Sequence, residues 1–200
     1  MRGLGLIVSL ALAGLCASAV LAEEAGKHLG VASCASGVCH GKTVAQAHEN
    51  VRLNEYATWS QNYHARAYRT LANQASKRMA ANLGSGTAQT ADICLDCHAN
   101  NVPAEARAEK FQIADGVSCE ACHGPASGWI DSHTDADATH QDNLARGMIA
   151  TEDPEVRAQL CLSCHMGNDK QYTTHRIMGA GHPRLTFELD WYSTNQPPHF

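Results

Sequence analysis

The stretch Cys94-Leu95-Asp96-Cys97-His98 holds two cysteines that are separated by two residues and followed at once by histidine. The same pattern returns at residues 119–123 and 161–165. This spacing is typical of covalent haem c attachment. Two thiols must reach the two vinyl groups of one porphyrin, and the adjacent histidine must then turn beneath the iron as an axial ligand. Because a random sequence of this composition would contain well under one match, three matches indicate a haem protein.

A fourth motif at residues 34–40 has four residues between its cysteines, a longer loop that can still bridge the same two vinyl positions. We therefore predict four covalently attached haems c. The predicted attachment residues are Cys34, Cys39, Cys94, Cys97, Cys119, Cys122, Cys161 and Cys164, and the predicted proximal iron ligands are His40, His98, His123 and His165.

Three other uses of paired cysteines explain the pattern less well. Two four-thiolate zinc sites would use all eight cysteines but give no reason for a histidine after every pair. Disulfides leave the four histidines unexplained. Iron–sulfur ligation needs cysteine runs without the histidine. The pattern therefore favours haem over each of these alternatives.

The composition fits a core that is built partly from cofactor. Aromatic residues make up only 6% of the chain. Four haems leave about 44 residues for each, too few to wrap every one in its own protein core. The fold class that follows is mainly α, with helices and long loops wrapped around four packed haems and little or no sheet. We expect the apoprotein to be largely unfolded, and the haems of His98 and His123 to touch because only 25 positions separate these ligands.

The N-terminus predicts export. Arg2 precedes an apolar run, and a small-residue pattern ends at Ala22, which is typical of a cleaved secretory signal over residues 1–22. The alternatives are a lipoprotein anchored through Cys16 and an uncleaved membrane anchor. A cleaved signal leaves one tetrahaem domain at residues 23–200, without a membrane span, in the periplasm or another exported compartment.

Helix signals dominate the rest of the chain. Residues 54–81 contain no glycine or proline and repeat aromatic residues at helical steps, which predicts one long helix. A second helix is expected from Pro103. Asp153 as N-cap and Pro154 as first helical residue predict a third helix that runs into residues 161–165. Strand signals are nearly absent.

Each haem iron needs a second axial ligand if it is to be six-coordinate. Four candidates rank first. His64 lies on the predicted helix at 54–81, and His133 lies ten residues after a haem histidine. His175 and His182 lie on either side of a Gly-Ala-Gly turn. Lower-ranked candidates are His48 and His140, then His28 and His199, and the thioethers of Met148, Met166 and Met178.

At these residues the chain resembles the multihaem cytochrome c-554 family. The resemblance spans roughly residues 31–200 and rests on three strings: Gly116-Val117-Ser118-Cys119-Glu120-Ala121-Cys122-His123-Gly124-Pro125, the helix that contains Trp59, His64, Ala65 and Ala67, and His175 with Gly179-Ala180-Gly181-His182-Pro183-Arg184-Leu185. It implies a mostly helical periplasmic protein with closely packed haem pairs that passes electrons between redox enzymes. The longer spacing between Cys34 and Cys39 departs from the usual attachment motif.

Two functional classes remain open from the sequence. In an electron carrier every iron has two protein ligands, whereas a reductase or oxidase of a small nitrogen or sulfur compound keeps one iron position open. A filament of stacked cytochromes is a third class. Four strong distal histidines favour the carrier. The formal net charge of −5 argues against a nucleic-acid partner and favours redox partners with a basic docking patch.

Overall fold

The structure, a computed structural model, describes residues 26–45 and 52–195. The predicted signal segment and the candidate ligands His48 and His199 lie outside these residues. The described part is mainly α-helical, as the sequence predicts, and has no β-strand. The helices are α1 (Glu55–Gln61), α2 (Tyr63–Thr70), α3 (Gln74–Leu83), α4 (Asp92–His98), α5 (Cys119–His123), α6 (Ile130–Thr134), α7 (His140–Ala145), α8 (Pro154–His165), α9 (His175–Gly179) and α10 (Leu189–Asn195).

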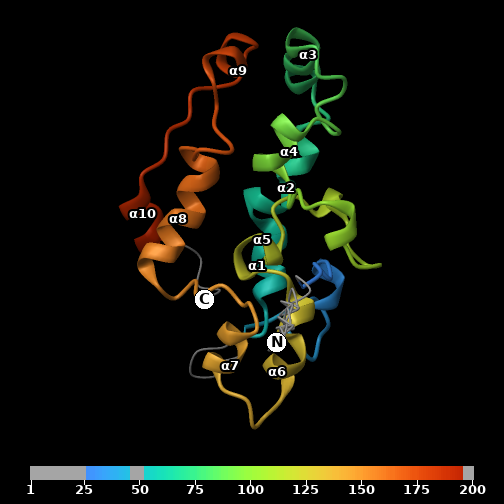
Figure 1. Ribbon diagram of the computed structural model, residues 1–200, viewed down its shortest axis with the longest axis vertical. Helices are drawn as coiled ribbons and strands as arrows, with labels where there is room; N and C mark the ends of the chain where they lie inside the picture. The colour runs from blue at the N-terminus through green and yellow to red at the C-terminus, as the bar shows by residue number, and fades with distance from the viewer. Residues whose placement is uncertain (1–25, 46–51, 196–200) are drawn as a thin grey trace, which may run out of the picture.

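The helices form an elongated arrangement in which distant parts of the chain lie side by side (Figure 1). Helices α1, α2 and α4 follow one another along the long axis, with α3 at one end and α6 and α7 at the other. Helix α8 runs alongside this column and contacts α4, while α9 contacts α3. The C-terminal third of the chain therefore covers the central helices.

The single helix predicted over residues 54–81 is wrong, because the structure breaks it twice. The side chain of Asn62 accepts a hydrogen bond from His64 N and starts α2. The side chain of Asn73 accepts one from Ser76 N and starts α3. Asparagine competes with the helical backbone for hydrogen bonds, so it favours N-caps over helix interiors. Three short helices replace the long one, and the chain can change direction between them.

The other two helix predictions had different outcomes. After Pro103 the chain makes only a short 3-10 turn at Ala104–Ala106, so the second predicted helix is wrong. The third is confirmed: α8 begins at Pro154, and the Asp153 carboxylate accepts hydrogen bonds from Glu155 N and Val156 N. This cap satisfies backbone donors that a helix start would otherwise leave without partners.

The protein core of the described residues is small. Its central cluster is built from Leu71, Ala80, Ala88, Leu95 and Ala99. Half of the buried hydrophobic residues, seven of fourteen, are alanine, and no large side chain is fully buried. Alanine removes little apolar surface from water, so this cluster contributes little hydrophobic stabilisation. The described protein atoms alone therefore make a weak core.

A glycine allows close packing beside the third attachment motif. Gly116 has φ of 77°, in the region that favours glycine, and a Cβ there would lie 2.5 Å from the His64 carbonyl oxygen. The next residue, Val117, donates its N–H to that same oxygen at 3.1 Å. This contact joins α2 to the loop before α5.

In the part of the chain that the structure describes, no helix is long and apolar enough to cross a membrane.

Candidate haem sites

Three of the four attachment motifs occupy short helical segments that end at the ligand histidine. Helix α4 ends at His98, α5 at His123 and α8 at His165. Residues three apart on a helix lie on the same face, so the two thiols of each motif point to the same side. Helical geometry therefore explains why the two-residue spacing suits one porphyrin.

The longer first motif follows a 3-10 turn at Val31–Ser33 and is folded by turns of its own. Cys39 N donates to Ser36 O at 3.0 Å, and His40 N donates to Cys34 O at 3.2 Å. These bonds close the four-residue loop and bring its two ends together. The geometry is compatible with attachment through Cys34 and Cys39.

Three of the predicted proximal histidines lie opposite three of the predicted distal histidines. The ring centroids are 5.9 Å apart for His40 and His133, 6.1 Å for His64 and His165, and 6.4 Å for His98 and His182. An iron–imidazole bond of about 2 Å, with the ring centroid about 1 Å behind the nitrogen, places two imidazoles on one iron about 6 Å apart. These residues therefore fit a haem iron between each pair.

Hydrogen bonds orient several of these rings. His98 Nδ1 donates to the Ala67 carbonyl oxygen at 3.2 Å, and His182 Nδ1 donates to the Pro183 carbonyl oxygen at 2.8 Å. A carbonyl oxygen can only accept, so each ring carries its proton on Nδ1 and keeps the Nε2 lone pair for a metal. His40 Nδ1 lies 2.9 Å from the Glu55 carboxylate, which has the same effect.

Desolvation by the surrounding protein atoms favours the neutral form of the ring at three of the ligand positions. It lowers the pKa of His98, His133 and His165 below the ordinary value, although part of the His133 side chain is exposed. Only neutral imidazole has a lone pair for iron, so a lowered pKa favours ligation near neutral pH.

The remaining proximal and distal candidates, His123 and His175, are not brought together in this way. His175 is exposed at the start of α9. Figure 1 shows α9 at the upper end of the molecule and α5, which ends at His123, well below it. His64 is also exposed, while its neighbour Ala65 is the buried residue of α2. His175 as a distal ligand stays a prediction.

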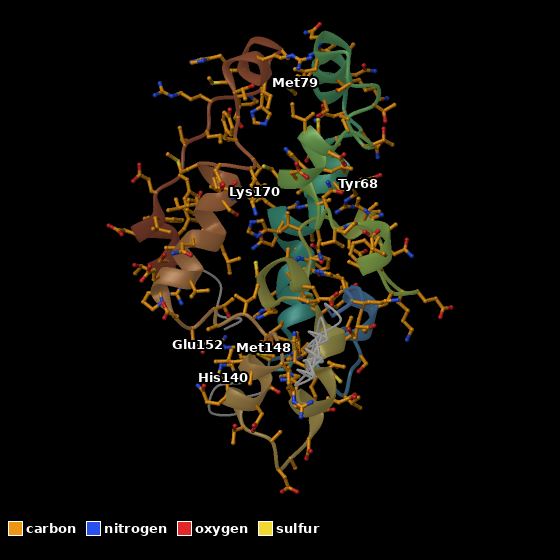
Figure 2. All side chains as sticks on the ribbon, viewed as in Figure 1. Tyr68, Met79, His140, Met148, Glu152 and Lys170 are labelled. Carbon is orange, nitrogen blue, oxygen red and sulfur yellow. The ribbon has the colours of Figure 1, made fainter. Side chains whose placement is uncertain are left out.

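Lower-ranked candidates have partners of other kinds. His28 Nδ1 accepts a hydrogen bond from the Asn100 side-chain amide at 3.0 Å, and its ring meets Phe111 edge-on. The His140 and Glu152 side chains lie next to each other on the left of the lower part of the molecule in Figure 2, with Nε2 and Oε1 2.9 Å apart. These contacts tie His28 and His140 to neighbouring polar and aromatic groups.

Contacts between thiols join motifs that are distant in the sequence. The thiol of Cys34 is a close neighbour of the Cys119 thiol, and the thiol of Cys97 is a close neighbour of the Cys164 thiol. The Cys164 thiol also donates to the Asp96 carbonyl oxygen at 3.8 Å. The first motif thus lies beside the third, and the second lies beside the fourth. The predicted contact between the haems of the second and third motifs stays a prediction.

The third and fourth motifs also lie near each other. Desolvation by the surrounding protein atoms, together with the nearby thiols of Cys161 and Cys164, raises the pKa of the Cys122 thiol to about 11. Cys122 belongs to the third motif, and the other two cysteines belong to the fourth.

The eight described cysteines form no disulfide bonds. Within residues 26–45 and 52–195, no group of three or more histidine, cysteine, aspartate or glutamate side chains is arranged to hold a metal ion.

A buried donor next to His133 also fits a haem. Trp129 is only 6% exposed, and its indole meets the His133 ring edge-on with centroids 5.5 Å apart. Its Nε1 is buried and finds no acceptor among the described residues. A buried indole N–H ordinarily has a hydrogen-bond partner, and a haem propionate is an acceptor of the right chemistry. Neither Trp129 nor Glu55 belongs to a recognisable motif, so the sequence does not predict their contacts with His133 and His40.

Comparison with known proteins indicates a cytochrome c554-like chain. Residues 33–124, which include the first three attachment motifs, match the family of cytochrome c554 and c-prime. The structure is similar to reduced cytochrome c554 from Nitrosomonas europaea, with a TM-score of 0.54 and 17% sequence identity over 86% of this chain and 84% of that chain. No curated protein matches the chain. The predicted resemblance and the predicted fold class are therefore confirmed.

Proposed function

We propose that this chain is a periplasmic tetrahaem c-type cytochrome that transfers electrons between redox partner proteins. The observation that carries the proposal is the set of three histidine pairs, with centroids 5.9–6.4 Å apart, each containing one attachment-motif histidine. The match to the cytochrome c554 and c-prime family supports haem c as the cofactor and electron transport as the role.

Each protein group has a separate task in this proposal. The eight motif cysteines would form the thioether bonds that fix the cofactors, and the four motif histidines would each bind one iron. His133, His64 and His182 would be the second ligands of the irons held by His40, His165 and His98 respectively. We assign His175 as the ligand for the remaining iron on sequence grounds. When bound, haem c supplies one-electron iron chemistry.

The contacts between motifs support transfer along the protein. Cys34 meets Cys119, Cys122 lies near Cys161 and Cys164, and Cys97 meets Cys164. All four motifs thus have another motif nearby, as electron transfer through the protein requires. Ring pairs that fill both axial positions favour this role over a reductase or oxidase, which would need an open iron position.

Charge and export complete the proposal. We propose that residues 1–22 are removed as a secretory signal and that residues 23–200 form the tetrahaem domain. Loss of Arg2 would change the formal net charge from −5 to −6. An acidic surface attracts a basic docking patch on a redox partner and steers its approach.

We expect the mature holoprotein to take up four electrons per chain. An anaerobic reductive titration, followed by the haem absorbance, should reach its end point at four equivalents because each of the four motifs binds one redox-active iron. Intact-protein mass spectrometry on the same sample should show four covalent haems and no residues 1–22. An end point at three equivalents, with three haems by mass, would mean that the Cys34–Cys39 loop does not attach haem.

A further inference from the structure

Glu55, the first residue of α1, is held in place by hydrogen bonds to a predicted iron ligand and to the backbone just before the helix. Its Oε2 accepts a hydrogen bond from His40 Nδ1 at 2.9 Å. Its Oε1 accepts from Arg52 N at 3.1 Å and from Leu53 N at 3.2 Å. Both carboxylate oxygens are therefore engaged, and the side chain has little freedom to leave the histidine.

The backbone fixes the same contact. Tyr56, the residue after Glu55, donates its N–H to the His40 carbonyl oxygen at 3.0 Å. The Glu55 side chain is only 19% exposed, so water screens its charge less than it would at the surface. The first motif and the first turn of α1 thus form one unit with a partly buried carboxylate against the ligand ring.

The other oriented ligands have neutral acceptors. His98 donates to the Ala67 carbonyl oxygen and His182 to the Pro183 carbonyl oxygen. A carboxylate draws the Nδ1 proton more strongly than a carbonyl does, which gives the ring more anionic character and makes it a more basic ligand. A more basic ligand stabilises ferric iron relative to ferrous iron, so it disfavours uptake of the electron.

We propose that Glu55 is a positioning residue that lowers the reduction potential of the haem attached at Cys34 and Cys39, through its hydrogen bond to His40. The inference rests on the proposed function. One electron from the redox partner reduces ferric to ferrous iron, and the Nδ1 proton stays between His40 and Glu55, so no proton is released. The acidic side chain sets the first haem apart from those whose ligands donate to backbone carbonyls.

The test replaces Glu55 and follows the four haems by spectroelectrochemical titration of the holoprotein. Glu55→Gln keeps an oxygen that can accept from Arg52 N and Leu53 N but removes the negative charge. We expect the equilibrium constant for reduction of one haem to rise about tenfold, equivalent to about 59 mV for one electron, while the other three stay unchanged. The affected haem should be the one whose low-spin signal is lost in His133→Ala.

The matched control is Glu152→Gln. Glu152 makes a 2.9 Å contact to His140, as Glu55 does to His40, but both side chains of this pair are more than half exposed and His140 follows no attachment motif. This variant should leave all four potentials unchanged. An equal shift in Glu152→Gln would show that any loss of one negative charge suffices, which would overturn the assignment to Glu55.

Failure of this inference is distinguishable from failure of the proposed function. Four haems with unchanged potentials in Glu55→Gln would overturn the role of Glu55 and leave the carrier intact, whereas fewer than four haems in the unmodified protein would contradict the carrier itself. If Glu55→Gln does not attach four haems, Glu55→Asp is titrated in its place. The aspartate keeps the charge at a longer distance, so it should raise the same potential by less, and no shift would overturn the inference.

Discussion

The chain made without haem attachment is expected to be largely unfolded. The described core consists of small residues, with seven alanines among fourteen buried hydrophobic side chains and no large side chain fully buried. Such a core removes too little apolar surface from water to offset a conformational entropy cost of about 1–2 kcal/mol per residue. The haem faces supply the missing apolar surface, and the thioether bonds hold them in place.

The measurement compares mature chain from a host that lacks haem-ligation machinery with holoprotein from a host that has it. Far-UV circular dichroism should show most of the helical signal lost in the former, with no cooperative transition in urea. A variant with the eight motif cysteines replaced by serine, made in the ligating host, should behave in the same way. Full helical content and a cooperative transition in the haem-free chain would show that the polypeptide folds alone.

Replacing His64 should open one iron position. His64 lies 6.1 Å from His165, centroid to centroid, so His64→Ala leaves that iron with a single protein ligand. We expect one haem of the four to change from low spin to high spin, and the reduced variant to bind one more equivalent of carbon monoxide than the unmodified protein. Absorbance difference spectra with and without carbon monoxide measure this directly.

His140→Ala is the control for this experiment. His140 contacts Glu152 and is half exposed, and its removal should leave spin state and carbon monoxide binding as they are in the unmodified protein. Carbon monoxide uptake that is identical in His64→Ala and the unmodified protein would refute the assignment of His64 as a ligand.

Local spacing made the attachment motifs and one helix predictable from the sequence. Two cysteines and a histidine within five residues predict haem attachment whatever fold surrounds them. Asp153 and Pro154 likewise mark the start of α8, since both act within one helical turn. Local rules also explain why one long helix was wrongly predicted at residues 54–81. The helical spacing of the aromatic residues was followed there, although Asn62 and Asn73 favour N-cap positions.

The sequence could not predict which motifs are neighbours or which histidines face each other, because both depend on contacts between residues that are distant in the chain. Separation along the chain predicted contact between the haems of the second and third motifs, whereas the thiol contacts in the structure join first with third and second with fourth. His133 could be ranked as a ligand, but its position opposite His40 comes only from the fold. Glu55 carries no sequence signal beyond its place at a helix start, and its role emerges from one 2.9 Å contact.

Electron transfer without an open iron position requires that pairs of histidines bind all four haems c. Low-temperature electron paramagnetic resonance of the oxidised holoprotein distinguishes the two cases, because six-coordinate low-spin and five-coordinate high-spin ferric haem give separate signals. We expect low-spin signals that integrate to four haems per chain, with no high-spin component. A high-spin signal that integrates to one haem per chain would contradict it and identify an iron open to substrate.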